Sequence, residues 1–515
     1  MKLVTSLSLL AFGMSLPAAT YYVDYATGND SSDGLTTSTP FKHCPGDTRA
    51  SGSASFTPST GDLILFKGGV TYTMDTNNIV TLGSHGVTYR GGQIHSTPWG
   101  SGWPVIDCTT NYPSLSGVNG SFNATSISNL VVEGLKFSGG PYDDSYSGFI
   151  SWRGTGGTLA NLTVRNNWFE NCLESGVFLW GSWDAGTASS EFVISNNVFT
   201  SVGTHGVFCR YGLSGVQILD NTFTNIGWRS DSPAPGGDPV GMFGHDSPSW
   251  NSDLLVRGNV SYGVPIKSFV ILSDQNENAI IERNWIGGTN GYAGLDINGN
   301  GTNITVRNNV FDLKVANFYG PVTVDTDQGS GTMVDGLNVY NNTISAQTAN
   351  IGLIFLGKGS SGSAQTSKNV DIRNNILLSQ TASRSIVYIE TSATSVPVTD
   401  LATFTADYNV NDPDGYATPF HITGTNYTFA QWQGLGYDTH GDEGTPTFSS
   451  GWELAASDTL AKGLGVDLSG SFTDDYLGLT RSVPWDIGAY KYVAPPVTGG
   501  AATAITVTVG TLTQP

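Results

Sequence analysis

The chain has 515 residues and a formal net charge of −20, and only 12% of its residues are charged. With 22 Lys and Arg in total, it is a poor partner for nucleic acid, because phosphate contacts need basic side chains. Its 66 glycines and abundant Asn, Ser and Thr favour short strands and turns over long helices. No apolar stretch after the first residues is long enough to span a membrane.

The N-terminus has the pattern of a signal peptide over residues 1–19. Lys2 supplies a positive charge, the segment up to Leu16 is largely apolar, and Pro17 to Ala19 provide small residues for cleavage. We therefore expect a secreted, extracellular protein whose mature chain starts near Thr20. The alternative is that this segment forms a first core strand or a cap.

Four cysteines are present in this apparently exported chain: Cys44, Cys108, Cys172 and Cys209. They allow two disulfides in three connectivities, and the alternative is four buried thiols. There is no Cys-x-x-Cys motif, so a zinc site is not expected.

One strand-and-turn unit recurs along the chain, for example as Leu162–Phe169, Phe192–Phe199 and Ile304–Phe311. In each unit, alternating apolar residues are followed by a pair of Asn or similar residues. The interval between units varies from 24 residues (197 to 221) to 38 residues (221 to 259). The equivalent positions are Gly134, Asn167, Asn197, Asn221, Asn259, Asn284, Asn309, Asn342, Asn375 and Asn409.

This repeat predicts an all-β fold, a single-stranded right-handed parallel β-helix (a solenoid) of roughly ten turns. Stacked units place parallel strands about 4.8 Å apart, and the Asn side chains can then hydrogen-bond along the axis. A sandwich or a propeller is the alternative, but propeller blades need longer repeats. The expected organisation is a signal peptide (1–19), an N-terminal cap with the first turns (20–125), the β-helix core (126–410), a closing segment (411–492), and a linker and tail (493–515).

A second strand can be aligned upstream of each Asn motif, for example Gly176–Trp180 and Gly294–Asn298. Alternation along a strand sends successive side chains to opposite faces. The predicted outward side chains change from aromatic near the N-terminus to polar and ionisable in the middle. They include Trp152, Phe178, Trp180, Arg210, His245, Asp246, Asp274, Asp296, Asn298, Asp325, Asp327, Tyr388 and Glu390.

Both ends of the chain resemble known secreted proteins. Tyr21–Asp24, Gly28–Gly34 and Gly61–Tyr72 are similar to the entry of the right-handed parallel β-helix (pectate-lyase-like) superfamily, and Trp485–Tyr490 is similar to its closing segment. The resemblance implies the fold and a secreted, carbohydrate-active protein. That superfamily includes polysaccharide lyases, glycoside hydrolases, esterases, epimerases and adhesive proteins, so the fold does not choose among activities.

The ionisable centre of the outward column suggests acid–base chemistry on a glycan. We expect catalytic residues among Asp246, Asp274, Asp296, Asp325, Asp327 and His245. Asp296 and Asp325, on adjacent turns, are predicted to lie about 5 Å apart, and Asp325 and Asp327, on one strand, about 7 Å apart. Retaining glycosidases need about 5–5.5 Å between carboxyl groups and inverting ones about 6.5–9.5 Å, so either mechanism is open.

The loop from Ile226 to Asn251 occupies the longest interval, and long loops on a rigid scaffold tend to carry function. The expected substrate-binding residues are Arg210, Trp180, Trp152, Asn298, Trp228, Arg229 and Lys267. No cofactor is required. Ca²⁺ is an option at Asp238, Asp246 and Asp274, since crowded carboxylates bind this ion.

Three functions follow from these patterns. The first is a glycoside hydrolase that uses paired carboxylates; the acidic, lysine-poor composition favours a neutral glycan. The second is a polysaccharide lyase in which Ca²⁺ or Arg neutralises a uronate. The third is a non-enzymatic glycan-binding or surface adhesion protein. A polysaccharide is the expected partner in each case, and the protein is expected to be a monomer without nucleic-acid or membrane partners.

Overall fold

A computed structural model gives the structure of the chain from residue 18 to residue 494. The residues between these limits that it does not describe are 75–79, 84, 109–121, 140–147, 155–158, 182–188, 228–236, 245–249, 264–267, 290–292, 317–319, 326–333, 349–350, 358–366 and 391–398. Residues 1–17 of the predicted signal peptide and the tail beyond residue 494 lie outside the described residues.

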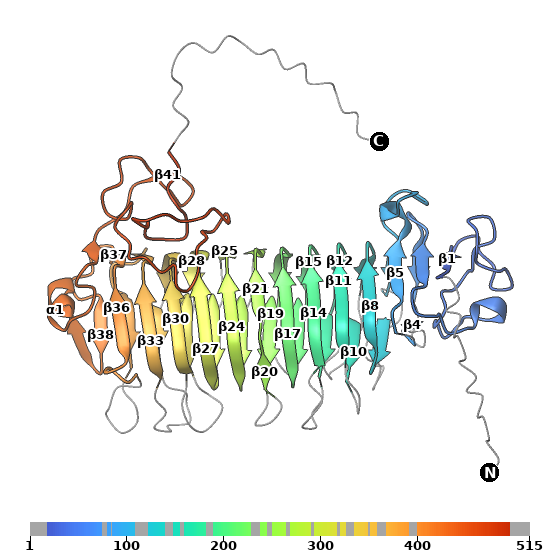
Figure 1. Ribbon diagram of the computed structural model, residues 1–515, viewed down its shortest axis with the longest axis horizontal. Helices are drawn as coiled ribbons and strands as arrows, with labels where there is room; N and C mark the ends of the chain where they lie inside the picture. Colours follow the sequence, from blue (N-terminus) through green and yellow to red (C-terminus); the bar gives the residue numbers. More distant parts are fainter. Residues whose placement is uncertain are drawn as a thin grey trace, which may run out of the picture.

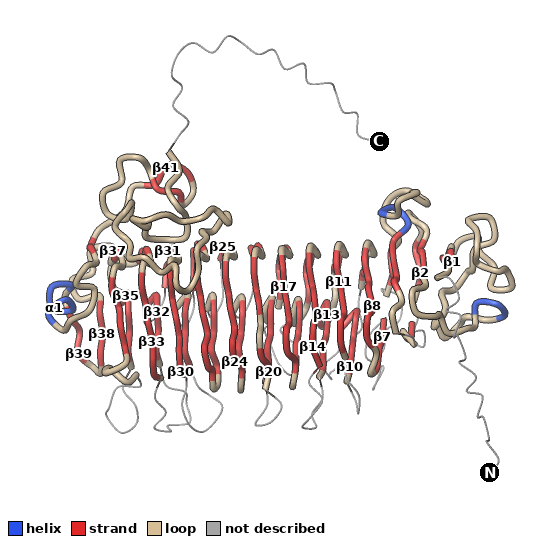
Figure 2. Tube along the Cα trace, in the orientation of Figure 1, coloured by secondary structure: helices blue, strands red, loops and turns tan. Residues whose placement is uncertain are grey.

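The chain winds into a coil with three long sheets that share one axis (Figure 1). Each turn contributes one strand to each sheet in the order sheet 1, sheet 2, sheet 3. Within the sheets nearly all described neighbours pair in parallel, with β38–β39 as the antiparallel exception. Figure 2 shows strands along the whole coil and helices only toward its ends. The predicted right-handed parallel β-helix is confirmed.

Sheet 1 has 14 strands. They are β1 (Thr20–Val23), β2 (Leu63–Phe66), β5 (Thr88–Gly91), β8 (Ser128–Glu133), β11 (Ala160–Arg165), β14 (Ser189–Ser195), β17 (Leu213–Leu219), β20 (Asn251–Ser252), β21 (Leu255–Arg257), β24 (Asn276–Glu282), β27 (Gly301–Arg307), β30 (Val334–Tyr340), β33 (Lys368–Arg373) and β36 (Phe404–Asp407).

Sheet 2 has 13 strands. They are β3 (Thr71–Thr73), β6 (Val105–Asp107), β9 (Lys136–Ser138), β12 (Trp168–Glu170), β15 (Val198–Val202), β18 (Thr222–Ile226), β22 (Val260–Tyr262), β25 (Trp285–Thr289), β28 (Val310–Ala316), β31 (Thr343–Thr348), β34 (Ile376–Ser379), β37 (Val410–Asp412) and β40 (Asp442–Glu443).

Sheet 3 also has 13 strands. They are β4 (Val80–Thr81), β7 (Phe122–Thr125), β10 (Gly148–Arg153), β13 (Ser175–Trp180), β16 (Val207–Arg210), β19 (Val240–Phe243), β23 (Val270–Ser273), β26 (Leu295–Asn298), β29 (Val322–Asp325), β32 (Gly352–Leu356), β35 (Ser385–Ile389), β38 (Phe420–Ile422) and β39 (Thr425–Tyr427). The remaining elements are η1 (Gly52–Ala54), η2 (Gly92–Ile94), α1 (Phe429–Gly434), β41 (Phe448–Ser450) and β42 (Glu453–Leu454).

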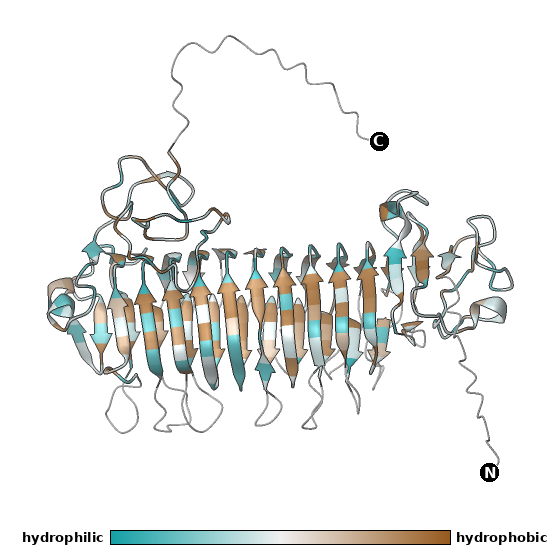
Figure 3. Cartoon of the chain, viewed as in Figure 1, coloured by the Kyte–Doolittle hydropathy of each residue, from teal (hydrophilic) through white to brown (hydrophobic). Residues whose placement is uncertain are grey.

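Alternate residues of the strands fill one continuous apolar core, and Figure 3 shows the resulting hydrophobic and hydrophilic bands along sheet 1. Four phenylalanines of sheet 2 stack through it on successive turns. Ring centroids of Phe137, Phe169, Phe199 and Phe223 lie 5.1, 4.8 and 4.9 Å apart with nearly parallel planes. Such offset stacks add to the free energy that burial of the rings supplies.

Buried asparagines line the bend between sheets 1 and 2, as predicted. Asn309, for example, is fully buried. Its Nδ2 donates to the Ile281 carbonyl at 2.8 Å and to Asn342 Oδ1 at 3.0 Å, and its Oδ1 accepts from Asn284 N and Nδ2 at 3.0 Å. The same contacts repeat from Asn167 onward. The ladder therefore satisfies buried backbone and side-chain groups in each turn from Asn167 to Asn409.

The ladder ends at Asp438, under the short helix α1. Asp438 Oδ1 accepts from Asn409 Nδ2 at 2.8 Å, and its Oδ2 accepts from Trp432 Nε1 at 3.1 Å. A Thr428–Gln431 capping box starts α1, and the Trp432 ring covers the end of the core. Burial raises the pKa of Asp438 to about 6, although these donors act in the opposite direction.

Residues 446–492, which we name the C-terminal lobe, fold back onto the side of the last turns (Figure 1). Asn374 Nδ2 donates to the Val466 carbonyl at 2.8 Å, and Asn341 Nδ2 donates to two further lobe carbonyls. Arg481 donates to Asn308 Oδ1 at 2.9 Å. Burial lowers the pKa of Arg481 to about 10, so it stays charged at neutral pH.

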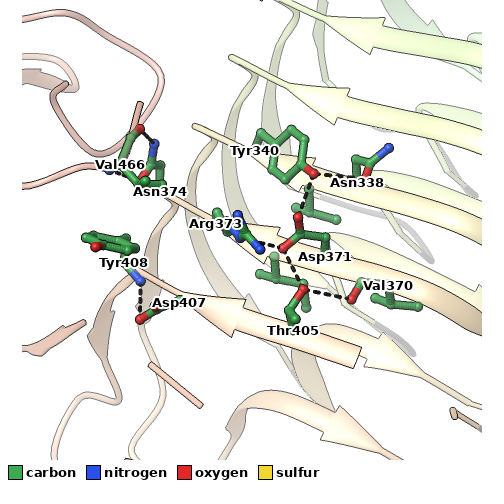
Figure 4. A network of polar contacts seen from close by, with 12 residues as sticks. Asn338, Tyr340, Val370, Asp371, Arg373, Asn374, Thr405, Asp407, Tyr408 and Val466 are labelled. Atoms are coloured by element: carbon green, nitrogen blue, oxygen red, sulfur yellow. Dashed lines mark hydrogen bonds and ion pairs between the residues drawn. The ribbon is translucent and has the colours of Figure 1, made fainter. Parts of the chain in front are cut away.

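A polar network on the outer face of sheet 1 adjoins the lobe (Figure 4). Tyr340 Oη donates to Asp371 Oδ2 at 2.7 Å, and Asp371 pairs with Arg373 at 2.8 Å. Burial raises the pKa of Tyr340, whose ring stacks on Phe472 of the lobe. The network thus fixes the lobe to the coil.

All four cysteines are buried, and no disulfide joins them in the described part of the chain. The alternative of buried thiols therefore holds. Burial raises the pKa of Cys44, Cys172 and Cys209, so these thiols stay protonated at neutral pH. In the described ranges no helix is long and apolar enough to cross a membrane.

Replacing Asn309 by Ala should destabilise the coil, because the buried Asn284 N–H and Nδ2 lose their acceptor and the Ile281 carbonyl loses a donor. We expect a loss of about 3 kcal/mol or more, since each buried unsatisfied group costs about 1–3 kcal/mol. The shift of the urea unfolding midpoint measures this loss of stability. Thr302→Ala, an exposed change in β27, is the control; an Asn309→Ala midpoint equal to that of Thr302→Ala would contradict the role of the ladder.

Asp438 should make stability depend on pH. Its folded-state pKa of about 6 exceeds the ordinary 3.8, so the folded chain binds the proton more tightly. The stabilisation from this proton is complete below about pH 4 and is lost as pH rises through about 6, by up to about 3 kcal/mol. Urea midpoints from pH 4 to 7 test this. Asp438→Asn should remove this component of the slope, and an unchanged slope would refute the assignment.

Candidate functional site

The outer face of sheet 3 carries two columns of side chains, fixed by the strand register. Column 1 consists of Phe178, Phe208, Gly241, Ile271, Asp296, Thr323, Phe355, Tyr388 and His421. Column 2 consists of Arg153, Trp180, Arg210, Phe243, Ser273, Asn298 and Asp325. The predicted outward direction of Trp180, Arg210, Asp296, Asn298 and Asp325 agrees with this register.

The prediction that Trp152 lies on this outer face is wrong. Trp152 pairs with Leu179, is fully buried and belongs to the core, while Arg153 takes the outward position beside Trp180. Because successive residues of a strand point to opposite faces, a one-residue difference in register exchanges inside and outside.

Two carboxyl groups, of Asp296 and Asp325, lie on adjacent strands near the middle of the face. Asp296 is level with Thr323 and Asp325 with Asn298, so the pair is diagonal. A strand spacing of about 4.8 Å and a two-residue rise of about 6.6 Å place their Cα atoms about 8 Å apart. The expectation that the two residues are direct cross-strand neighbours, about 5 Å apart, is therefore wrong. Both side chains are 5% exposed.

Aromatic and cationic groups occupy the N-terminal part of the face. The guanidinium carbons of Arg153 and Arg210 lie 5.0 and 5.3 Å from the Trp180 ring centroid. Arg210 also donates to the Tyr211 hydroxyl. The face thus changes from cationic and aromatic at β10–β16 to acidic at β26–β29.

Sequence reasoning missed His205, which lies on this face. Its ring stacks on Phe208 with a centroid distance of 4.3 Å, in the space left by the absent side chain of Gly241. A Cβ at Gly241 would lie 2.8 Å from the His205 ring. Asp238 Oδ2 is 3.6 Å from His205 Nε2, and its Oδ1 accepts from Ser268 N. A Gly at an otherwise bulky column position is the sequence signal that points to this ring.

At the C-terminal part of the face three aromatic rings continue column 1. Tyr388 stacks on His421 with centroids 4.0 Å apart, and Phe355 lies 5.8 Å from Tyr388. His421 Nε2 accepts from the Gly424 amide, so its Nδ1 carries the proton and donates to Asn426. The ring extends the aromatic surface of column 1.

The predicted calcium site cannot hold one ion between Asp238 and Asp274. Asp238 precedes β19, and Asp274 follows the neighbouring strand β23, which is paired with β19 in register. The two residues are therefore apart along the strand direction by at least the length of a four-residue strand, about 13 Å. Among the described residues no group of three or more His, Cys, Asp or Glu could hold a metal ion. The other predicted site residues lie outside the described ranges: Trp228, Arg229, His245, Asp246, Lys267 and Asp327.

Residues 62–260 match the family model described as a right-handed beta helix region. This chain is a right-handed parallel β-helix protein. No curated protein matches its sequence. Among solved structures, XylC in complex with xylose has a TM-score of 0.50 at 10% identity, covering 92% of this chain and 98% of that one.

Two further solved structures are less similar. Pectate lyase Pel9A has a TM-score of 0.43 at 15% identity and covers 93% of this chain and 98% of its own. The GH87 alpha-1,3-glucanase of Streptomyces thermodiastaticus strain HF3-3 has a TM-score of 0.39 at 13% identity, and the match covers 78% of this chain and 65% of that one. At 10% identity, the likeness to XylC establishes the parallel β-helix fold alone.

The two tryptophans should respond differently to replacement by Ala. Trp152→Ala should lower the free energy of unfolding by about 3–5 kcal/mol, because it leaves a cavity in the core. Trp180→Ala should change it by much less, since that ring is partly exposed on the outer face. Urea unfolding of both variants provides the test, and equal losses would contradict the register of β10 against β13.

Proposed function

We propose that this protein is an exported glycoside hydrolase that cleaves a polysaccharide on the outer face of sheet 3. The observation that supports this proposal is the diagonal pair of Asp296 and Asp325. Their Cα atoms lie about 8 Å apart on neighbouring strands of one rigid sheet. Two side chains of equal length that leave the same face in parallel keep roughly this spacing at their carboxyl groups, and inverting glycosidases hold theirs about 6.5–9.5 Å apart.

The geometry supports a single-displacement reaction. One carboxyl group of the pair donates its proton to the glycosidic oxygen as the bond from that oxygen to the anomeric carbon breaks. The other carboxylate takes a proton from a water molecule that attacks this carbon from the opposite side. The diagonal spacing leaves room for that water, whereas direct cross-strand neighbours would lie at the closer spacing that a covalent intermediate requires.

The rest of the face is suited to a linear polymer. Trp180 lies toward one end, and the stacked pair Tyr388 and His421 toward the other, with the two carboxyl groups between them. Aromatic faces pack against the apolar faces of sugar rings, while flanking polar groups bind hydroxyls. Asn298, level with Asp325, is placed to orient the sugar at the bond that breaks.

A polysaccharide lyase is the second candidate, favoured by Arg153 and Arg210 on either side of Trp180. In β-elimination a cation neutralises the uronate carboxylate while a base removes the neighbouring proton. These arginines lie at least three strand spacings, or about 14 Å, from the Asp296 strand, so they would serve a different centre on the same face.

Incubation of the chain with neutral and uronate-containing polysaccharides separates the candidates. Hydrolysis releases reducing ends without an ultraviolet-absorbing double bond, and Asp296→Asn and Asp325→Asn should each lower kcat by at least about 100-fold. NMR of the fresh product should show an inverted anomeric configuration. Asp335→Asn, an exposed change on sheet 1, should leave the rate unchanged.

Three results would reject the proposal of an inverting hydrolase at the Asp296–Asp325 pair. They are an ultraviolet-absorbing product that depends on Arg153 and Arg210, a retained anomeric configuration, and full activity of both Asp→Asn variants. The first of these would move the lyase into its place.

A further inference from the structure

A second surface, on sheet 2, has the features of a binding site and is separated from the Asp296 face by the core of the coil. The C-terminal lobe covers sheet 2 at its last strands, where Ile376 and Val410 pack against lobe residues. Trp103 contacts Trp168 of β12 at the other end. Figure 1 shows β12, β15 and β25 between the C-terminal lobe and the segment that follows β5. Tyr262 of this stretch is 44% exposed.

Trp285 of β25 lies against the outer face of sheet 2 because its neighbour is Gly287. A Cβ at Gly287 would lie 2.1, 2.6 and 2.7 Å from Cη2, Cζ3 and Cζ2 of Trp285. The indole therefore extends along its own strand and occupies the place of the missing side chain. A ring in this position turns one broad side toward the sheet and the other away from it.

The neighbouring strands complete the platform. Val260 pairs with Trp285, so Tyr262 is level with Gly287, whose missing side chain the indole replaces. Thr224 pairs with Tyr262 on the next strand. On the other side Asp312 pairs with Gly287 and accepts from Lys314 at 2.7 Å. Two aromatic side chains are thus flanked by hydroxyl, carboxylate and ammonium groups.

We infer that the platform of Trp285 and Tyr262 binds a neutral polysaccharide chain, independently of the proposed catalytic face. Flat aromatic surface bordered by hydrogen-bonding groups suits sugar rings, which have apolar faces and polar rims. The net charge of −20 opposes a polyanionic ligand, and the charges on the strand next to Trp285, Asp312 and Lys314, neutralise each other. The small, polar-bordered aromatic area differs from the large hydrophobic cores of protein interfaces.

Affinity electrophoresis in gels that contain soluble xylan, mixed-linkage glucan or polygalacturonate tests this inference. At least one neutral polymer should retard the chain, and polygalacturonate should not. Trp285→Ala and Tyr262→Ala should each raise the Kd for the neutral polymer by about tenfold, which corresponds to about 1.4 kcal/mol. Gly287→Ala keeps the indole but displaces it, and should also weaken binding. Circular dichroism and the Tm establish that each variant is folded.

Two control variants separate this surface from the others. Trp99→Ala removes a partly exposed indole in the segment after η2, and this variant should bind the neutral polymer as the unchanged chain does. Asp296→Asn should retain binding even where it abolishes hydrolysis, so the failure of one proposal is distinct from the failure of the other. Unchanged Kd values for Trp285→Ala and Gly287→Ala would overturn the inference. The inference would also be overturned if none of the neutral polymers retards the chain, or if polygalacturonate, or single-stranded DNA in a parallel gel, retards it.

Discussion

Amide-to-amide hydrogen bonding along the buried asparagine ladder is the interaction on which the coil depends. A parallel β-helix bends its backbone twice or more per turn, and a buried bend leaves N–H and C=O groups that water cannot reach. Each ladder Asn supplies both a donor and an acceptor there, as Asn284, Asn309 and Asn342 do. An apolar residue at this place would leave the backbone groups unsatisfied, at a cost comparable to a lost hydrogen bond for each group.

The ladder also sets where functional side chains lie. Because one point of every turn is held in register, loops of different length can leave and re-enter the coil without shifting the strands. The registers from β16 to β29 remain in phase although the intervals between turns differ. Side chains far apart in sequence, such as Arg210 and Asp325, therefore share one straight column. A binding face of this kind is as rigid as the sheet that carries it.

The fold could be predicted because its cause is local and repeated. The ladder Asn and the alternation before it recur in the sequence in each turn from Asn167 to Asn409, so the predictions of both the coil and the ladder are correct. The site depends on register between strands joined by variable loops, which no local pattern fixes. The alternation therefore assigns Trp152 to the wrong face, and it predicts Asp296 and Asp325 side by side rather than on a diagonal. His205 escapes prediction because Gly241, in another turn, makes room for its ring.

Asp438 gives the coil a chemical end point. Every ladder amide from Asn167 through Asn409 donates one hydrogen bond to the next ladder side chain on the C-terminal side, and Asp438 receives the last of these bonds. An ionised carboxylate has no N–H with which to continue the series. Duplication of a turn upstream of residue 409 would lengthen the solenoid without breaking this polarity, whereas a turn appended after Asp438 would begin with an acceptor that receives no donor from the ladder. Turns can thus be added within the solenoid, but the ladder cannot continue beyond Asp438.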